Sequence, residues 1–344
     1  MSRWVLHVDL DQFIAAVEVL RHPELSGKPL VVGGDGDPSK RGVVSTASYA
    51  AREFGVHSGQ PLRTAKKRCP DCVFLPVDAP AYLAVSAEVM QVLRDTGAPV
   101  EVLGWDEAFV GIEAADPESF ARELAASVKE ATRLDCSVGI GQNKLQAKIA
   151  TGYGKPAGVF RLTSGTWYEL LGDRPPDVIW GIGAKTVAKL AGLGIHTVRE
   201  LAAADPDRLA AEFGPMTGPW LVLLGQGRGD AEVDPTPYVA RSHGREVTFQ
   251  QNIEDWAQVR AEVARLARQV AAEVMERTVA RAVVKVRYAP FLTVTHGVPF
   301  PASGHALFDP PSFEAAALAA LAQFEPGRPV RLLGVRAEFT DEPA

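Results

Sequence analysis

Hydrophobic and polar positions change period several times along the first half of the chain. Residues 4–8 form an apolar run rich in branched and aromatic side chains, which predicts a short strand. Phe13, Ala16, Val17 and Leu20 recur at helical spacing and predict a helix with one buried face. The same criteria predict helices over about 81–94 and 117–132, a hairpin over 100–110 and a strand over 136–141. This order of strand, helix, hairpin, helix and strand is that of a ferredoxin-like fold.

The intervening and following segments have different patterns. Residues 28–34 and 42–46 predict two short strands, and Ser48 is expected to cap a helix that ends at Gly55. The segment 175–234 is helical and punctuated by glycines, and the paired prolines at 235 and 237 mark a linker. Beyond the linker, strands are predicted over 245–249, 281–288, 292–298 and 330–339, with helices over 256–277 and 312–323.

Two carboxylates, Asp9 and Asp11, follow the first predicted strand at once. Asp11 immediately precedes the helical pattern, so we expect it to be the N-cap. Asp9 can hold a divalent cation while the free backbone N–H groups of the first helical turn face an anion. A metal beside a phosphate is what phosphoryl transfer requires, although a purely capping role is the plainer alternative.

The best partners for Asp9 are Asp106 and Glu107, at the tip of the predicted hairpin. Adjacent strand residues point to opposite faces, so both carboxylates share one site only if the turn or a bulge re-aims them. A solvated hairpin tip is the alternative. Tyr49 and Arg52 lie three positions apart on one predicted helix and offer a hydroxyl and a guanidinium that suit a triphosphate, although a surface arginine packing on a tyrosine is the plainer alternative.

The stretch His-Val-Asp-Leu-Asp-Gln-Phe at 7–13, together with Trp-Asp-Glu-Ala-Phe at 105–109, resembles the Y-family DNA polymerases of the DinB (DNA polymerase IV) branch, in its actinobacterial type. Further matches occur in order at 46–56, 137–140, 143–144, 147–150, 155–158, 181–183 and 331–335. The similarity covers nearly the whole chain. It implies an α+β, multidomain right-hand polymerase, with a ferredoxin-like palm (1–18 and 77–167), small fingers (19–76), a helix-hairpin-helix thumb (168–233), a linker (234–240) and an α+β little finger (241–341).

The resemblance also implies a reaction, in which a primer 3′-OH attacks the α-phosphate of a nucleoside triphosphate. Asp9 and Asp106 would bridge two Mg²⁺ ions, for which Mn²⁺ can substitute, with Glu107 and the Leu10 carbonyl as further ligands. The residues expected to bind the incoming nucleotide are Gln12, Phe13, Ile14, Thr46, Tyr49, Arg52 and Lys155. Low-fidelity translesion synthesis is likewise implied. A two-metal nuclease or phosphatase and a catalytically silent DNA-binding homologue are the alternatives.

Primer–template DNA is the expected partner, although the formal net charge of −6 is unusual for a DNA-binding protein. The segment 241–287 is locally basic, and local charge matters more than the total. The expected DNA contacts are Lys148, Gly181, Gly183, Lys185, Thr186, Arg241, Ser242, Arg245, Lys285, Arg287, Thr293 and Thr295. A glycine-rich helix connection and a solvated strand face are the alternatives for the thumb and little-finger residues.

Three features depart from the family pattern. Ile14 stands where most members carry an aromatic steric gate against the ribose 2′-OH, so we expect weak discrimination against ribonucleotides unless isoleucine fills the same space. Gly104 and Trp105 replace the usual residues before the acidic pair. The sequence ends shortly after Pro343 without a clamp-binding peptide, so clamp binding through the tail is doubtful.

Composition adds few constraints. The 344 residues are 47% hydrophobic and 23% charged, as in an ordinary globular protein, and a monomer is expected. The sequence has no apolar run long enough to cross a bilayer and no signal peptide, which favours the cytoplasm. Cys69 and Cys72 form a lone C-x-x-C pair, expected to be reduced structural thiols because no second pair completes a zinc site.

Overall fold

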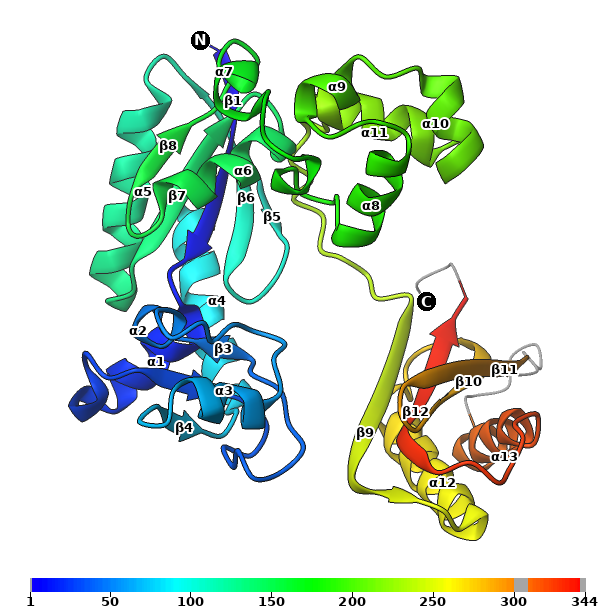
Figure 1. Cartoon of the computed structure of the whole chain (residues 1–344). Coiled ribbons are helices and arrows are strands. Elements are labelled where there is room, and N and C mark those ends of the chain that lie inside the picture. Colours follow the sequence, from blue (N-terminus) through cyan, green and yellow to red (C-terminus); the bar gives the residue numbers. More distant parts are fainter. Residues whose placement is uncertain (1, 300–308, 341–344) are drawn as a thin grey trace. The chain divides into compact units, whose positions relative to one another are not determined.

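The computed structural model describes residues 2–299 and 309–340 (Figure 1). Contacts divide the chain into two compact units, and the main boundary, between residues 237 and 238, falls inside the predicted linker. Residues 39–41 group with the second unit. Both units combine helices with a sheet, so the α+β class is confirmed. No helix among the described residues is long and apolar enough to cross a membrane.

The first unit is built on a five-stranded sheet that forms the predicted palm. Its strand order is β5(Val100–Val102), β6(Glu107–Ala114), β1(Ser2–Leu10), β7(Cys136–Gly141) and β8(Val159–Arg161). Helices α4(Ala79–Asp95) and α5(Pro117–Thr132) cover one face (Figure 1). Alternate residues of β1, namely Leu6, Val8 and Leu10, are buried against those helices. The predicted ferredoxin-like order is confirmed, with β8 added beside β7.

Helix α6(Lys144–Gly154) packs closely against β7. The close approach depends on Gly139, because a Cβ at this position would lie 2.0 Å from the carbonyl oxygen of Ala147 and 2.3 Å from the backbone nitrogen of Thr151. Any side chain at residue 139 would therefore push the helix away from the sheet. The glycine of this motif thus fixes how near the lysines of α6 come to the strands.

The predicted fingers contain a three-stranded sheet in the order β3(Thr46–Ala47), β2(Leu30–Val32) and β4(Val73–Leu75). Helix α1(Phe13–Arg21) follows β1, and α2(Tyr49–Arg52) and α3(Leu62–Arg68) complete this part. The Ser48 hydroxyl accepts from the Ala51 N–H, which confirms the predicted cap. The predicted strand over 42–46 was misplaced, since β3 begins only at Thr46, and the predicted helix over 48–54 is shorter in the structure. Cys69 and Cys72 form a disulfide, so the expectation of reduced thiols is wrong.

The predicted thumb is helical, as its pattern indicated. It contains α7(Trp167–Leu171), the 3-10 turn η2(Pro176–Val178), α8(Ala184–Gly192), α9(Val198–Ala202), α10(Pro206–Phe213) and α11(Thr217–Gly225). Trp167 is fully buried at its centre and donates its indole N–H to the carbonyl oxygen of Gly225 at 2.8 Å. A buried tryptophan needs such a partner for its only polar group.

The second unit is a four-stranded antiparallel sheet in the order β11(Leu292–Pro299), β10(Val279–Tyr288), β12(Val330–Phe339) and β9(Ser242–Ile253). Helices α12(Trp256–Glu273) and α13(Pro310–Leu321) pack on one face and enclose a core of small and branched side chains (Figure 1). The predicted order of strand, helix, two strands, helix and strand is confirmed. Residues 341–344, on which the clamp expectation rests, lie outside the described residues.

Candidate active site

The pairing of β1 with β6 brings acidic side chains from two strands together. Asp9 lies opposite Glu107, and His7 lies opposite Phe109. Alternate side chains of a strand share a face, so His7 and Asp9 extend from the face of β1 that is turned away from α4 and α5. One potential ligand atom from each of His7, Asp9 and Glu107 lies within 4.8 Å of the other two. The structure therefore groups two of the three predicted carboxylates with a histidine that was not predicted as a site residue.

Asp106 occupies the turn that precedes β6, and its backbone oxygen accepts from the Leu10 N–H at 2.9 Å. Burial raises the pKa of the Asp106 carboxyl, and the negative charges of Asp9 and Glu107 raise it further. The turn therefore brings Asp106 into the electrostatic field of the other two carboxylates. Clustered carboxylate oxygens are the donor set that hard divalent cations such as Mg²⁺ prefer.

Two lysines offset part of this negative charge. Lys155 Nζ lies 2.5 Å from Asp9 Oδ1, and Lys148 of α6 forms an ion pair with Glu107. The pKa of Glu107 falls to about 2, because its carboxylate accepts a hydrogen bond from His7 and is paired with the Lys148 ammonium, against the opposing effect of burial. Lys148 was predicted as a DNA contact, and in the structure its ammonium is paired with the Glu107 carboxylate.

Asp11 is not the N-cap of α1, so that prediction is wrong. Gln12 takes the N-cap position, with a left-handed backbone at φ 44° and ψ 39°. The buried Asp11 carboxylate instead accepts from the hydroxyls of Tyr49 (2.6 Å) and Ser137 (3.0 Å) and from the Ala157 N–H (2.7 Å). The left-handed residue starts the helix one position later, which leaves the Asp11 side chain pointing back into the palm.

The predicted triphosphate-binding residues line the neighbouring part of the fingers. The Arg52 guanidinium lies 5.0 Å from the centre of the Tyr49 ring, so these two side chains share a face as predicted. The Tyr49 N–H donates to Gln12 Oε1 at 2.6 Å, and Arg52 Nε donates to the Ala47 carbonyl at 3.0 Å. Burial raises the pKa of the Tyr49 hydroxyl, and its hydrogen bond to Asp11 raises it further. Tyr49 is thus held neutral and fixed in place.

Three further predicted nucleotide contacts lie on either side of this pair. Thr46, in β3, is partly buried. Phe13 is buried in the palm core, and Ile14 is partly buried against the same core. Ile14, the predicted gate residue, thus has a portion of its side chain left facing out of the core at the start of α1.

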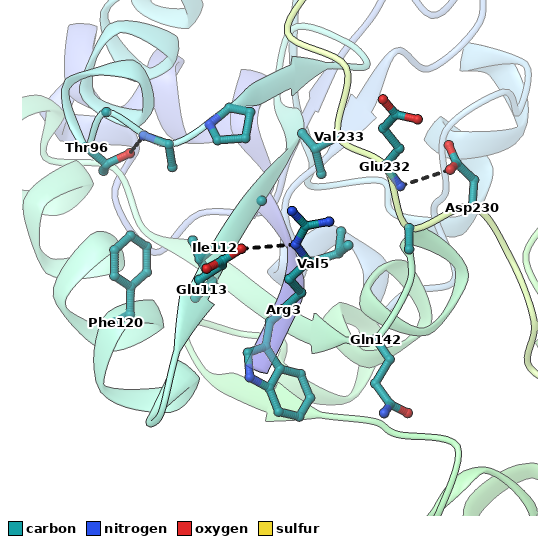
Figure 2. Close-up of a pocket in the computed structure, with 16 residues that line it drawn as sticks. Arg3, Val5, Thr96, Ile112, Glu113, Phe120, Gln142, Asp230, Glu232 and Val233 are labelled. Atoms are coloured by element: carbon teal, nitrogen blue, oxygen red, sulfur yellow. Dashed lines mark hydrogen bonds and ion pairs between the residues drawn. The ribbon is translucent and has the colours of Figure 1, made fainter. Parts of the chain in front are cut away.

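A cavity of about 590 Å³ adjoins the carboxylates. Its lining includes His7, Asp9, Lys148 and Lys155 from the palm, together with Arg174 and Trp180. A larger cavity, of about 1010 Å³, lies at the opposite end of β1 (Figure 2). Figure 2 shows the Arg3–Glu113 ion pair beside it, and none of the predicted site residues lines it. We therefore place the candidate active site at the smaller cavity, because of the charged groups that line it and not because of its size.

The predicted helix-hairpin-helix lies between η2 and α8. Gly181 has a positive φ of 95°, which favours glycine, and a Cβ there would lie 3.3 Å from the Trp220 ring. Gly183 is the N-cap of α8, and a Cβ there would meet open space. Lys185 is exposed and Thr186 partly exposed in the first turn of α8. The turn therefore presents backbone N–H groups and a lysine to solvent, as a phosphate contact requires.

In the second unit, most predicted DNA contacts share the sheet face that α12 and α13 leave open. Register places Thr295 beside Lys285 and Thr293 beside Arg287, and Arg287 Nε donates to the Thr293 hydroxyl at 2.9 Å. Lys285 pairs with Glu246 across Gly334. Ser242 lies four residues before Glu246 on β9, and alternate residues of a strand share a face, so Ser242 also lies on this open face.

Arg245 is not on the open face. It lies opposite Val335, which belongs to the core under the helices, and its guanidinium is paired with Glu273 of α12 at 2.7 Å. Arg241 is exposed just before β9. The structure therefore leaves Arg245 engaged within the unit, whereas Lys285 and Arg287 occupy the face that a nucleic acid could reach.

Comparisons with known proteins agree with this site. Residues 8–152 match the profile of the impB/mucB/samB family, and residues 240–343 match that of its C-terminal domain. DNA polymerase IV 2 of Mycobacterium tuberculosis is 48% identical over 343 residues, which cover 98% of each chain. The chain belongs to the Y family of DNA polymerases, in the DNA polymerase IV branch. It is accordingly a DNA-directed DNA polymerase of the translesion type.

Other Y-family members support the same placement. DNA polymerase IV of Methanoculleus marisnigri is 40% identical, with coverage of 97% of this chain and 94% of the relative. Among solved structures, a Y-family chimera of Dbh and Dpo4 has a TM-score of 0.86 at 25% identity, covering 97% of this chain and 98% of the chimera. An insertion ternary complex of Dbh DNA polymerase has a TM-score of 0.68 at 26% identity and covers 98% of each chain. The right-hand Y-family fold is confirmed.

Proposed function

We propose that this Y-family member extends a DNA primer by two-metal nucleotidyl transfer, with Asp9, Asp106 and Glu107 as the metal ligands. The observation that carries the proposal is that Asp9 and Glu107 lie opposite each other where β1 pairs with β6, next to Lys148 and Lys155, with Asp106 in the turn just before β6. The donor set fits Mg²⁺, and Mn²⁺ has similar ligand preferences. When bound, such ions stabilise the attacking and leaving oxygens of an in-line displacement.

The residues of the chain itself would bind and orient the substrates. Lys155, now paired with Asp9, would neutralise phosphate oxygens once a cation takes over that carboxylate. Arg52 has guanidinium N–H groups beyond the one that it gives to Ala47, and Tyr49 is fixed by Asp11. The backbone N–H groups of Gln12 to Ile14 would face the triphosphate at the start of α1. Leu10 would supply its carbonyl to the triphosphate-side metal.

Ile14 is the proposed steric gate. Its partial burial at the start of α1 fits a residue that abuts the sugar of the incoming nucleotide. A branched aliphatic side chain is shorter than phenylalanine and cannot stack flat on a sugar. Weak discrimination against ribonucleotides is therefore part of the proposal, which makes both deoxy- and ribonucleoside triphosphates candidate substrates.

Primer–template DNA would lie against the turn of α8 and against the open sheet face of the second unit. The basic residues Lys185, Lys285 and Arg287 suit phosphate contacts without sequence readout. A monomeric state, a cytoplasmic location and the doubtful use of a clamp stay predictions from the sequence.

Primer extension on an undamaged template, with Mg²⁺, tests the proposal directly. Wild type should extend the primer, and Asp106→Ala should abolish extension while DNA affinity, measured by fluorescence anisotropy, stays within about two-fold because the carboxylate is not a phosphate contact. Asp95→Ala, an exposed change on α4, is the matched control and should extend like wild type. Activity retained in Asp106→Ala would contradict the site assignment. Shortening of the primer would favour a nuclease, and binding without extension a silent homologue.

A further inference from the structure

His7 is a fully buried polar residue that the proposed mechanism does not use. It lies on the central strand β1, two positions before Asp9, and only 1% of it is exposed. Its ring lies 5.1 Å from the Phe109 ring, centre to centre. Burying an imidazole costs free energy unless its nitrogens find partners, so both ring nitrogens need to be accounted for.

Both nitrogens have partners, on two different elements. Nδ1 lies 2.8 Å from the Thr151 hydroxyl of α6, and Nε2 lies 3.1 Å from Glu107 Oε2 of β6. Lys148, one helical turn before Thr151, contacts the same Oε2 and lies 3.2 Å from His7 Nε2. A chain of contacts therefore runs from α6 through His7 to a proposed metal ligand.

The contacts leave one carboxylate oxygen of Glu107 available. Oε2 takes both His7 and Lys148, whereas no described residue hydrogen bonds to Oε1. A carboxylate with one oxygen held by fixed donors presents the other in a defined direction. Partners of this kind, one step removed from the cation, orient metal ligands, and their loss typically lowers metal affinity by about 10–100-fold.

We propose that His7 is a positioning residue for Glu107, donating Nε2–H to Oε2 while Nδ1 accepts from the Thr151 hydroxyl. Nε2 faces the Glu107 carboxylate, which only accepts, and the Lys148 ammonium, which only donates. The ammonium has the carboxylate as its own partner, so we assign the histidine proton to Nε2, in the bond to Oε2. That leaves Nδ1 as an acceptor. The Thr151 hydroxyl lies 2.8 Å from Nδ1, 3.0 Å from the Ala147 carbonyl oxygen and 3.2 Å from the His7 carbonyl oxygen, and in this tautomer its one proton goes to Nδ1, the nearest of the three. The inference rests on the proposed metal site, and it assigns a role to two residues, His7 and Thr151, outside the ligand set.

The tautomer can be read in the full-length, metal-free protein by ¹⁵N NMR of the histidine side chains. The His7 signals are assigned by their loss in His7→Gln. Protonation at Nε2 is expected. Protonation at Nδ1 would overturn the proposal, because His7 would then donate to Thr151 and Lys148 alone would hold Glu107. This measurement needs neither DNA nor activity, so it stands or fails separately from the proposed function.

The positioning effect is tested by titrating the full-length protein with Mn²⁺ and following free Mn²⁺ by EPR, without DNA or nucleotide. Thr151→Val removes the hydroxyl at nearly constant volume and should weaken Mn²⁺ binding by about 10-fold, whereas Thr151→Ser should bind like wild type. Thr132→Val is the matched control, since it removes another buried threonine hydroxyl, on α5, which donates to the Val128 carbonyl at 2.7 Å. Unchanged binding in Thr151→Val would overturn the proposal.

The same samples exclude or reveal direct ligation by His7. Electron spin-echo measurements of bound Mn²⁺ detect a directly coordinated nitrogen. The expected spectrum lacks the ¹⁴N coupling of a ligated imidazole, because His7 Nε2 is taken by Glu107. A strong ¹⁴N coupling that disappears in His7→Gln would make His7 a metal ligand and would overturn its positioning role.

Discussion

Replacing Asp11 by alanine removes an acceptor that three donors share. The Ala157 N–H and the Ser137 hydroxyl are left facing an apolar methyl group, and the Tyr49 hydroxyl loses its anchor. An unsatisfied buried donor costs about 1–3 kcal/mol. Tyr49 is partly exposed and Ala157 is exposed, so both donors can turn to water, and the fully buried Ser137 hydroxyl dominates the loss. We expect Asp11→Ala to lower the free energy of unfolding by about 2–4 kcal/mol.

Urea denaturation measures this loss, and a double-mutant cycle isolates its cause. Asp11→Ala, Tyr49→Phe and the double variant should show a coupling energy of about 0.5–3 kcal/mol, because the two side chains are in contact. Asp135→Ala is the matched control: its exposed carboxylate pairs only with Lys129 at the surface and should cost about 0–1 kcal/mol. The KM for a deoxynucleoside triphosphate should rise in Asp11→Ala, since Tyr49 loses its position. Zero coupling, with α1 alone destabilised, would mean that Asp11 is a cap after all.

Three other changes follow from the structure. Ile14→Phe should reduce ribonucleotide incorporation relative to wild type in parallel primer-extension lanes, and equal incorporation would remove the gate hypothesis. Tyr82→Phe removes the buried 2.6 Å hydrogen bond to Glu18 and should cost about 1–3 kcal/mol in urea denaturation. Burial, and then the hydrogen bond to Glu18, raise the pKa of Tyr82 to about 12. The stability that the hydroxyl contributes is therefore complete below about pH 10 and is lost as the pH rises through 12. A difference in unfolding free energy between wild type and Tyr82→Phe that is constant up to about pH 12 would contradict this. Gly139→Ala should displace α6 from β7 by collision with the Ala147 carbonyl and cut activity together with stability, and a wild-type melting curve would refute it.

Much of the fold follows from local patterns in the sequence. The period of apolar positions predicted most palm strands and helices to within a few residues, because those elements bury one face and their apolar positions must repeat every 2 or 3.6 residues. Helix α6 and strand β8 were not predicted. The order of elements then allowed a ferredoxin-like sheet, which the structure confirms. The short strands and helix of the fingers were placed less well, since a two- or four-residue element carries too little periodicity to define its ends.

The site was predictable only as far as chemistry shows in single residues and motifs. Asp9, Asp106 and Glu107 stand out because they lie in two motifs that resemble those of the Y-family polymerases. His7 could have been found by counting back two positions from Asp9, which puts it on the same strand face. Its partner Thr151 could not, because the contact joins residues 144 positions apart and depends on how closely α6 sits on β7.

The sequence by itself determined the family, through its motifs, and the order of elements, through the spacing of apolar positions, because both are properties of the chain before it folds. Only the tertiary structure decided where each side chain points. Because Gln12 has a left-handed backbone, Asp11 is a buried hydrogen-bond acceptor and not a cap. Because Arg245 is paired with Val335, its side chain lies on the helix-covered face of the sheet. The direction in which a side chain points is set by the local backbone angles and by the strand register. Both are fixed by packing between segments that lie far apart in the chain.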